Sequence, residues 1–88
     1  MTETEFRNEL AQQGFETVRE VTWEPGKTNS SHVHDFTAYG LVLRGQFTLE
    51  SEDGVRECGP GDTFFMAAGN QHEERIGPQG AALLVGRK

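Results

Sequence analysis

The spacing of hydrophobic positions predicts a helix only at the start of the chain, over residues 1–14. Phe6 and Leu10 are four residues apart and therefore share one face, whereas most of their neighbours are polar. Thr2 followed three residues later by Glu5 matches a capping box, which marks a helix start. So short and polar a helix is stable only if its hydrophobic face docks on another element.

From residue 15 onward, short runs rich in β-branched and aromatic residues alternate with turn-forming Gly and Pro. This pattern predicts an all-β sandwich or barrel over residues 15–88, within a single domain that spans residues 1–88. The expected strands are Thr17–Trp23, Thr37–Leu43, Gln46–Glu50, Gly54–Glu57, Thr63–Met66, Gln71–Ile76 and Ala81–Val85. The expected turns include Arg44-Gly45, Asp53-Gly54, which is the strongest hairpin signal, and Pro78-Gln79-Gly80.

The last expected strand, Ala81–Val85, is hydrophobic throughout, which indicates that both of its faces are covered. The core covers one face, and a second subunit is a candidate for the other. Together with the short helix, this strand suggests a homodimer.

Charge and composition exclude several classes of function. The chain has 14 Asp and Glu against 8 Lys and Arg, a net charge of −6, and such a surface repels nucleic acid and anionic lipid. No hydrophobic stretch approaches the ~20 residues that span a bilayer, and the N-terminus lacks a signal-peptide pattern. The single cysteine, Cys58, has no disulfide partner in the chain. We therefore expect a cytoplasmic protein without a nucleic-acid or membrane partner.

The chain holds three histidines: His32, His34 and His72. On a strand, residues two apart leave the same face with Cα atoms about 6.6 Å apart, so His32 and His34 can converge on one metal ion. On a helix, the same spacing sends the two side chains to nearly opposite sides. By itself, His-x-His is equally compatible with a surface strand that carries two histidines by accident.

A longer pattern surrounds the His32-Val33-His34 sequence. Five residues separate Gly26 from His32, and ten residues separate His34 from Gly45. This resembles the first motif of the cupin superfamily, which runs Gly, five residues, His-x-His, three or four residues, Glu, six residues and Gly.

A second pattern leads to the third histidine. Gly61, five residues, Ala67-Ala68-Gly69, two residues and His72 resemble the second cupin motif, which has Pro-x-Gly before its histidine. The resemblance implies that the barrel is an antiparallel jelly roll, or double-stranded β-helix, with the short helix outside it. It also implies that all three histidines bind a metal.

The chain departs from the first motif at the glutamate, which falls where this sequence has Ala38 or Tyr39. Ala38 shares the strand parity of His34, so it faces inward and offers no ligand atom, whereas Tyr39 faces outward unless a bulge turns it. Three neutral imidazoles then hold a divalent ion with open coordination positions. Imidazole suits Zn, Cu, Fe and Ni better than Mg or Ca, and Mn also remains open as the metal.

An open metal centre of this kind suits a small oxygenated ligand that is anionic or enolisable. The pattern is similar to the three-histidine branch of the superfamily, which includes thiol dioxygenases and a diketone-cleaving dioxygenase. This implies a metal-dependent oxygenase or isomerase. The alternative is a non-catalytic module that binds and senses a small sugar or acid. Hydrolysis through a catalytic triad is excluded, because no histidine remains to serve a serine.

Other side chains are candidates for the wall of a ligand pocket. Glu74 shares the parity of His72 and can turn inward as a fourth ligand or general base, although Glu73-Glu74-Arg75 is more typical of a solvated charged strand. Asp35 is expected to face away from the metal, and Cys58 is expected to be a structural thiol. The pocket candidates are Phe36, Ala38, Tyr39, Phe47 and Glu74, and the phenylalanines expected in the core or pocket wall are Phe36, Phe47, Phe64 and Phe65.

Overall fold

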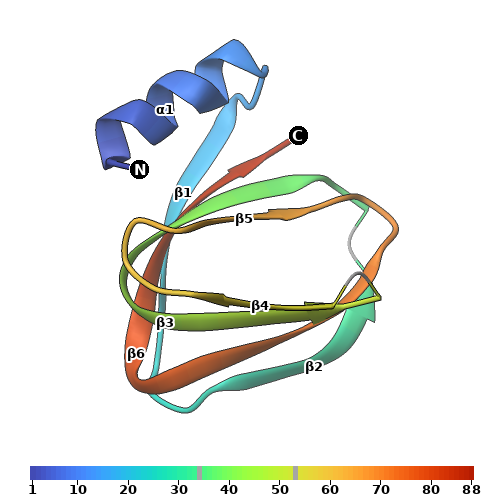
Figure 1. Cartoon of the computed structure of the whole chain (residues 1–88). Helices are drawn as coiled ribbons and strands as arrows, with labels where there is room; N and C mark the ends of the chain where they lie inside the picture. The colour runs from blue at the N-terminus through green and yellow to red at the C-terminus, as the bar shows by residue number, and fades with distance from the viewer. Residues whose placement is uncertain (34, 53) are drawn as a thin grey trace.

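The computed structural model describes residues 1–33, 35–52 and 54–88, with the backbone alone for residues 29–33. Within these residues, every strand pairing is antiparallel and the strands curl into a jelly-roll barrel with one short helix outside it, as expected (Figure 1). The elements are α1 (Glu3–Gln12), β1 (Thr17–Trp23), β2 (Thr28–Val33), β3 (Ala38–Ser51), β4 (Gly54–Cys58), β5 (Thr63–Met66) and β6 (Gln71–Arg87).

Two long strands, β3 and β6, form the frame of the barrel. β6 pairs with β1, β2 and β3, and β3 also pairs with β4 and β5. The turns expected at Arg44-Gly45 and Pro78-Gln79-Gly80 are wrong, because both segments lie inside continuous strands. The β3–β6 register instead shifts near Gly45, and Gly45 and Gly80 adopt φ values of +83° and +78°. Bulges and left-handed glycines bend a strand without ending it, so each long strand contributes to both sides of the barrel.

The remaining strand predictions agree with the structure, with one omission. β1 and β5 have the expected bounds. β3 and β4 form the expected hairpin, whose last pair is Ser51 with Gly54, and Asp53 lies outside the described residues. The expected strands did not include β2, although metal binding by His-x-His requires a strand there.

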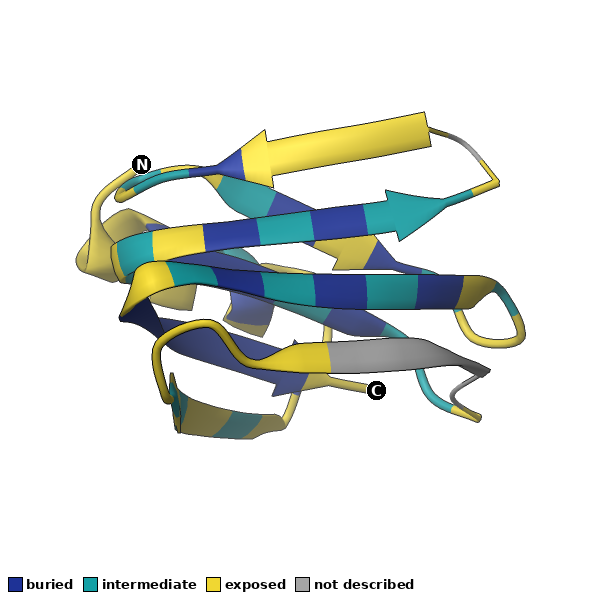
Figure 2. Cartoon of the chain, turned by 90° about the horizontal axis from the view of Figure 1, so that it is seen from below, coloured by how far each residue is buried: buried dark blue, intermediate teal, exposed yellow. Residues whose placement is uncertain are grey.

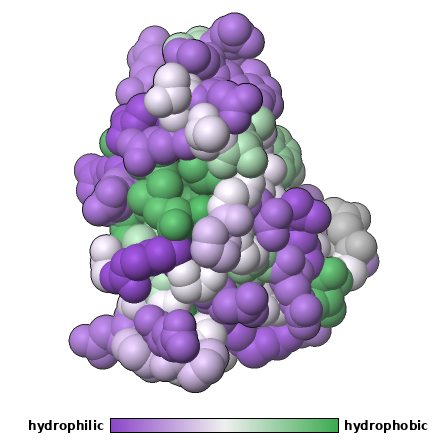
Figure 3. Space-filling view, turned by 60° about the vertical axis from the view of Figure 1, so that its left-hand side comes forward, coloured by the Kyte–Doolittle hydropathy of each residue, from purple (hydrophilic) through white to green (hydrophobic). Residues whose placement is uncertain are grey.

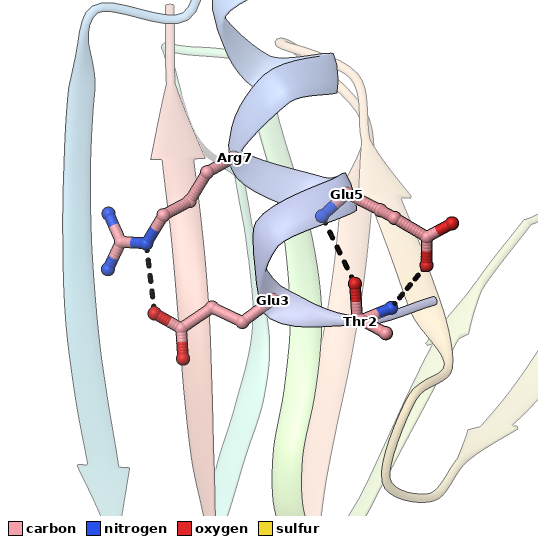
Figure 4. Close-up of polar contacts among 4 residues, drawn as sticks. All are labelled: Thr2, Glu3, Glu5 and Arg7. Carbon is pink, nitrogen blue, oxygen red and sulfur yellow. Dashed lines mark hydrogen bonds and ion pairs between the residues drawn. The ribbon is translucent and has the colours of Figure 1, made fainter.

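The N-terminal helix is held by its own capping box and by its hydrophobic face. Thr2 Oγ1 accepts a hydrogen bond from the Glu5 backbone N–H at 3.2 Å, and Glu5 Oε1 accepts one from the Thr2 N–H at 2.9 Å (Figure 4). Phe6 and Leu10 are 0% and 1% exposed and pack on the outer face of the sheet. The helix ends at Gln12, slightly earlier than expected.

Two hydrophobic clusters lie on opposite faces of the sheet. Figure 2 shows the corresponding bands of buried and less buried residues along the strands. The inner cluster fills the barrel, and the outer one joins α1 to Leu41 and Leu84, so the chain's own helix covers the outer face of the last strand at Leu84.

Below the helix, hydrophobic side chains continue on the side of the barrel within a hydrophilic surround (Figure 3). The homodimer stays a prediction. The inner cluster consists of Ala38, Val42, Phe47, Leu49, Cys58, Phe64, Met66, Ile76, Ala81, Leu83 and Val85.

Candidate functional site

His72 stands at the start of β6 and faces the interior of the barrel. Its side chain is 3% exposed, whereas the residues on either side of it in the strand are more exposed. Its Nδ1 lies 3.2 Å from the Asn70 carbonyl oxygen. Because a carbonyl only accepts, this contact places the ring proton on Nδ1 and makes Nε2 the nitrogen whose lone pair is suited to a metal.

Strand register brings a second histidine beside His72. In the β2–β6 pair, His32 is the direct partner of His72, and in the β3–β6 pair Ser51 is the partner on the other side. Directly opposite residues in antiparallel strands share a face of the sheet. A row across three strands therefore contains His32, His72 and Ser51, at the end of the barrel where the β3–β4 hairpin lies (Figure 1).

The third expected ligand, His34, lies outside the described residues, as does the side chain of His32. Among the side chains that the structure does describe, no three His, Cys, Asp or Glu residues gather closely enough to hold a metal ion. The backbone register that pairs His32 on β2 with His72 on β6 is therefore the observation on which the three-histidine site can be assessed.

Glu74 lies in the next row into the barrel, and it is buried. Its register partners are Asn29 on β2 and Leu49 on β3, and its side chain is 7% exposed. The solvated position that its charged neighbours suggested is therefore wrong, because the two-residue period of a strand separates them. Glu73 is half-buried and holds Arg75 at 3.4 Å.

The row below Glu74 is hydrophobic and forms the floor of this end of the barrel. Ile76 pairs with Phe47, and both are buried. The Phe47 ring lies 4.6 Å from the ring of Phe64, centroid to centroid. Phe47 is thus confirmed as interior, and the inner face of β6 changes from polar to hydrophobic within five residues.

A cavity of about 290 Å³ opens at the end of β3 and the start of β6, and His72 is one of its lining residues. The lining carries the carboxylates of Glu50, Glu52 and Glu73, and Arg75 lies 3.6 Å from Glu50 and 3.4 Å from Glu73. The described lining is therefore net negative, which disfavours an anionic ligand. The lining residues are Glu50, Ser51, Glu52, Gln71, His72 and Glu73.

Ala38 and Tyr39 occupy opposite faces, as their parity predicted. Ala38 is 1% exposed in the inner cluster and supplies no ligand atom. Tyr39 belongs to the outer cluster, and its hydroxyl donates to Glu9 Oε1 at 2.9 Å, so its place among the pocket candidates is wrong. Burial and the bond to Glu9 raise the pKa of Tyr39.

The remaining candidates divide between the interior and the surface. Phe36 is half-buried against the inner cluster, with the Arg87 guanidinium carbon 4.5 Å from its ring centroid. Phe65 is 55% exposed, so its expected place in the core or pocket wall is wrong. Asp35 is exposed. Cys58 is buried, and burial raises the pKa of its thiol, so it has the properties of a structural cysteine.

Sequence reasoning did not single out Ser51 and Asn29, which share rows with His72 and Glu74. No local signal marks these two positions. Only the register between distant strands identifies them.

A family model for the cupin domain matches residues 19–85. This chain belongs to the cupin family. The match includes both segments that resemble the cupin motifs, and the jelly-roll barrel of this cupin agrees with it. No helix within the described part of this cupin has the length and hydrophobicity needed to cross a membrane.

Solved structures share the fold of this cupin at low sequence identity. A protein of unknown function from Rhizobium leguminosarum bv. viciae has a TM-score of 0.76 and 20% identity, over 81% of this chain and 67% of that one. An RmlC-like cupin from Shewanella frigidimarina has a TM-score of 0.67 and 22% identity, over 80% of this chain and 64% of that one.

An oxalate decarboxylase from Bacillus subtilis, with Mn(II) centres, has a TM-score of 0.66 and 22% identity. The match covers 81% of this chain but 20% of the decarboxylase. No curated protein matches this cupin. These likenesses establish the fold.

Proposed function

We propose that this cupin binds one divalent transition metal through His32, His34 and His72 and presents it to a small molecule at the end of the barrel. The observation that carries the proposal is the β2–β6 register, which makes His32 the direct partner of His72. Two histidines that are 40 positions apart in the sequence thereby share one row of the sheet. His34 follows two positions after His32, at the spacing that keeps strand residues on one face.

The chemistry of the donor set fits a transition metal. The Asn70 carbonyl orients the His72 ring through Nδ1, an arrangement common behind metal-binding histidines, and Nε2 supplies the lone pair. Three imidazoles suit Zn, Cu, Fe or Ni, and an oxygen ligand from a small molecule would also suit Mn. When bound, such an ion polarises a ligand oxygen and lowers the pKa of coordinated water.

The surrounding residues indicate the class of ligand. Ile76 and Phe47 close the floor of this end with hydrophobic groups and keep bulk water out from below. The carboxylates that line the cavity repel anions, so we favour a neutral, enolisable carbonyl compound over an anionic acid. The reaction we propose is therefore a metal-dependent oxygenation or isomerisation of such a compound.

Elemental analysis of untagged protein, purified without added metal, tests the metal site. We expect about one transition-metal ion per chain in the parent and near zero in His72→Ala, because a site with two remaining imidazoles binds far more weakly. Val55→Ala is the control, since Val55 is an exposed side chain on β4 and should leave the metal content unchanged. Metal retained by His72→Ala would contradict the proposal.

Oxygen uptake and product analysis of the iron-loaded and manganese-loaded protein, with a panel of neutral diketones and hydroxyketones, test the reaction. Turnover of one panel member supports the enzyme. Tight, metal-dependent binding without turnover would show a sensing module instead. Preference for small organic acids would contradict the argument from the acidic lining.

A further inference from the structure

The side of the barrel between β4 and β5 is closed by side chains rather than by strand pairing. β4 and β5 each pair with β3, on either side of its bend at Gly45, and the loop of residues 59–62 joins them (Figure 1). Among the residues that the structure describes, no backbone hydrogen bond runs from β4 to β5. The hydrogen-bonded wall of the barrel is therefore interrupted on this side.

Arg56 on β4 bridges the two strands. It is the register partner of Leu49 and shares the parity of Cys58, so it lies on the strand face that carries the inner cluster. Its Nε donates a hydrogen bond to the Thr63 carbonyl oxygen of β5 at 2.8 Å. An arginine in such a place covers hydrophobic neighbours with its methylene stem and keeps its charge in water. Arg56 thus closes the barrel where strand pairing does not.

The single cysteine of the chain lies directly behind this bridge. Cys58 follows Arg56 by two positions on the same face of β4, and its side chain is 1% exposed. Its Sγ lies 3.9 Å from the same Thr63 carbonyl oxygen that accepts from Arg56. A thiol buried in hydrophobic surroundings is unreactive. Reaction of Cys58 with an added reagent therefore reports whether this side of the barrel opens.

We propose that Arg56 is the latch of a side entrance to the barrel, which opens locally between β4 and β5 while the rest of the fold stays intact. The first four residues of β4 are exposed, and within the described residues β4 pairs with β3 alone. Segments with few buried contacts open at a lower free energy than the whole domain. The hydrogen bond from Arg56 to Thr63 is the contact whose loss frees β4 from β5.

The side entrance is separate from the cavity beside His72, whose lining includes neither Arg56 nor Thr63. It leads to the inner cluster, where Phe47 and Phe64 are buried. A charged molecule would lose its hydration there, so the entrance suits small uncharged molecules. This inference does not depend on the metal site.

The experiment measures how fast Cys58 of the metal-free, full-length protein reacts with dithiodipyridine, an uncharged reagent that releases a coloured thione. When closing is faster than the reaction, the rate is the open fraction multiplied by the rate for an exposed thiol. Arg56→Met keeps a hydrophobic stem but has no N–H group to donate. We expect it to react about five- to tenfold faster than the parent, because the loss of one net hydrogen bond changes an equilibrium by about that factor.

Arg19→Met is the matched control. Arg19 is an exposed arginine on β1, at the other end of the strand order from β4, so this variant should react at the parent's rate. Each protein is also measured unfolded in concentrated urea at the same pH, which corrects for the effect of the Arg56 charge on the thiol. Equal rates for Arg56→Met and the parent would overturn the latch, as would an equal acceleration by Arg19→Met.

The urea dependence of the reaction separates local opening from global unfolding, and it needs only the parent protein. Local opening exposes little surface, so the logarithm of the rate should rise with urea less steeply than the equilibrium constant for global unfolding. This measurement serves if Arg56→Met does not fold. A parent whose Cys58 reacts only with the full slope of global unfolding would rule out the side entrance.

Discussion

Gly40 leaves space for the Phe64 ring inside the barrel, and Gly40→Ala should therefore destabilise the protein. Gly40 on β3 is the register partner of Phe64 on β5. A methyl carbon added to Gly40 would approach Cζ of that ring most closely and would lie 2.5 and 2.6 Å from its two Cε atoms. Carbon atoms pack favourably at about 3.5–4.0 Å, so the ring must move by more than about 1 Å.

The ring has little room to move. Phe64 is 2% exposed, and its ring packs against that of Phe47, which is fully buried. Overpacking of a core costs about 1–3 kcal/mol, and the rigid neighbour places Gly40→Ala in the upper half of that range. For a domain of this size, each kcal/mol lowers the Tm by about 4–8 °C.

Urea denaturation of the metal-free protein measures this cost, with Gly59→Ala as the control. A methyl group at Gly59 meets only Gln46 Nε2, at 3.8 Å, so its effect should stay within about 0.5 kcal/mol. Phe64→Leu removes the ring that clashes, so Gly40→Ala combined with Phe64→Leu should lose at least ~1 kcal/mol less than the sum of the single changes. Additive losses, or a Gly40→Ala protein as stable as the parent, would refute the steric reasoning.

Two further predictions concern the contacts of the helix. Burial and the bond to Glu9 raise the pKa of Tyr39 in the folded state above its ordinary value near 10. The protonated Tyr39 hydroxyl therefore stabilises the folded protein below pH ~10, and this contribution is lost as the pH rises through the folded pKa. Urea titrations between about pH 8 and 11 should show a shallower alkaline loss in Tyr39→Phe, and an identical slope would disprove the link. Thr2→Ala removes the hydroxyl that accepts from the Glu5 N–H and should cost about 1 kcal/mol, seen as a lower Tm by circular dichroism; an unchanged Tm would show that the cap contributes nothing.

The local sequence was sufficient for the elements whose signals lie within a few residues. The capping box and the four-residue spacing of Phe6 and Leu10 predicted a docked helix, because these contacts form between near neighbours. The hairpin after Ser51 followed from turn chemistry, and the parity of Ala38 and Tyr39 predicted their opposite faces. The two cupin-like motifs predicted the jelly roll that the family match supports.

Tertiary structure decided which residues meet. The Gly and Pro signals that mark turns in β hairpins also mark bends within a strand. β3 and β6 run unbroken through Gly45 and Gly80, because hydrogen bonds to neighbouring strands continue on both sides of each bend. The row of His32 and His72, and the burial of Glu74 one row deeper, depend on register between strands that are far apart in the sequence. Sequence parity shows only which of two faces a side chain takes. Whether that face is solvent or barrel interior, and what lies opposite, is set by long-range pairing.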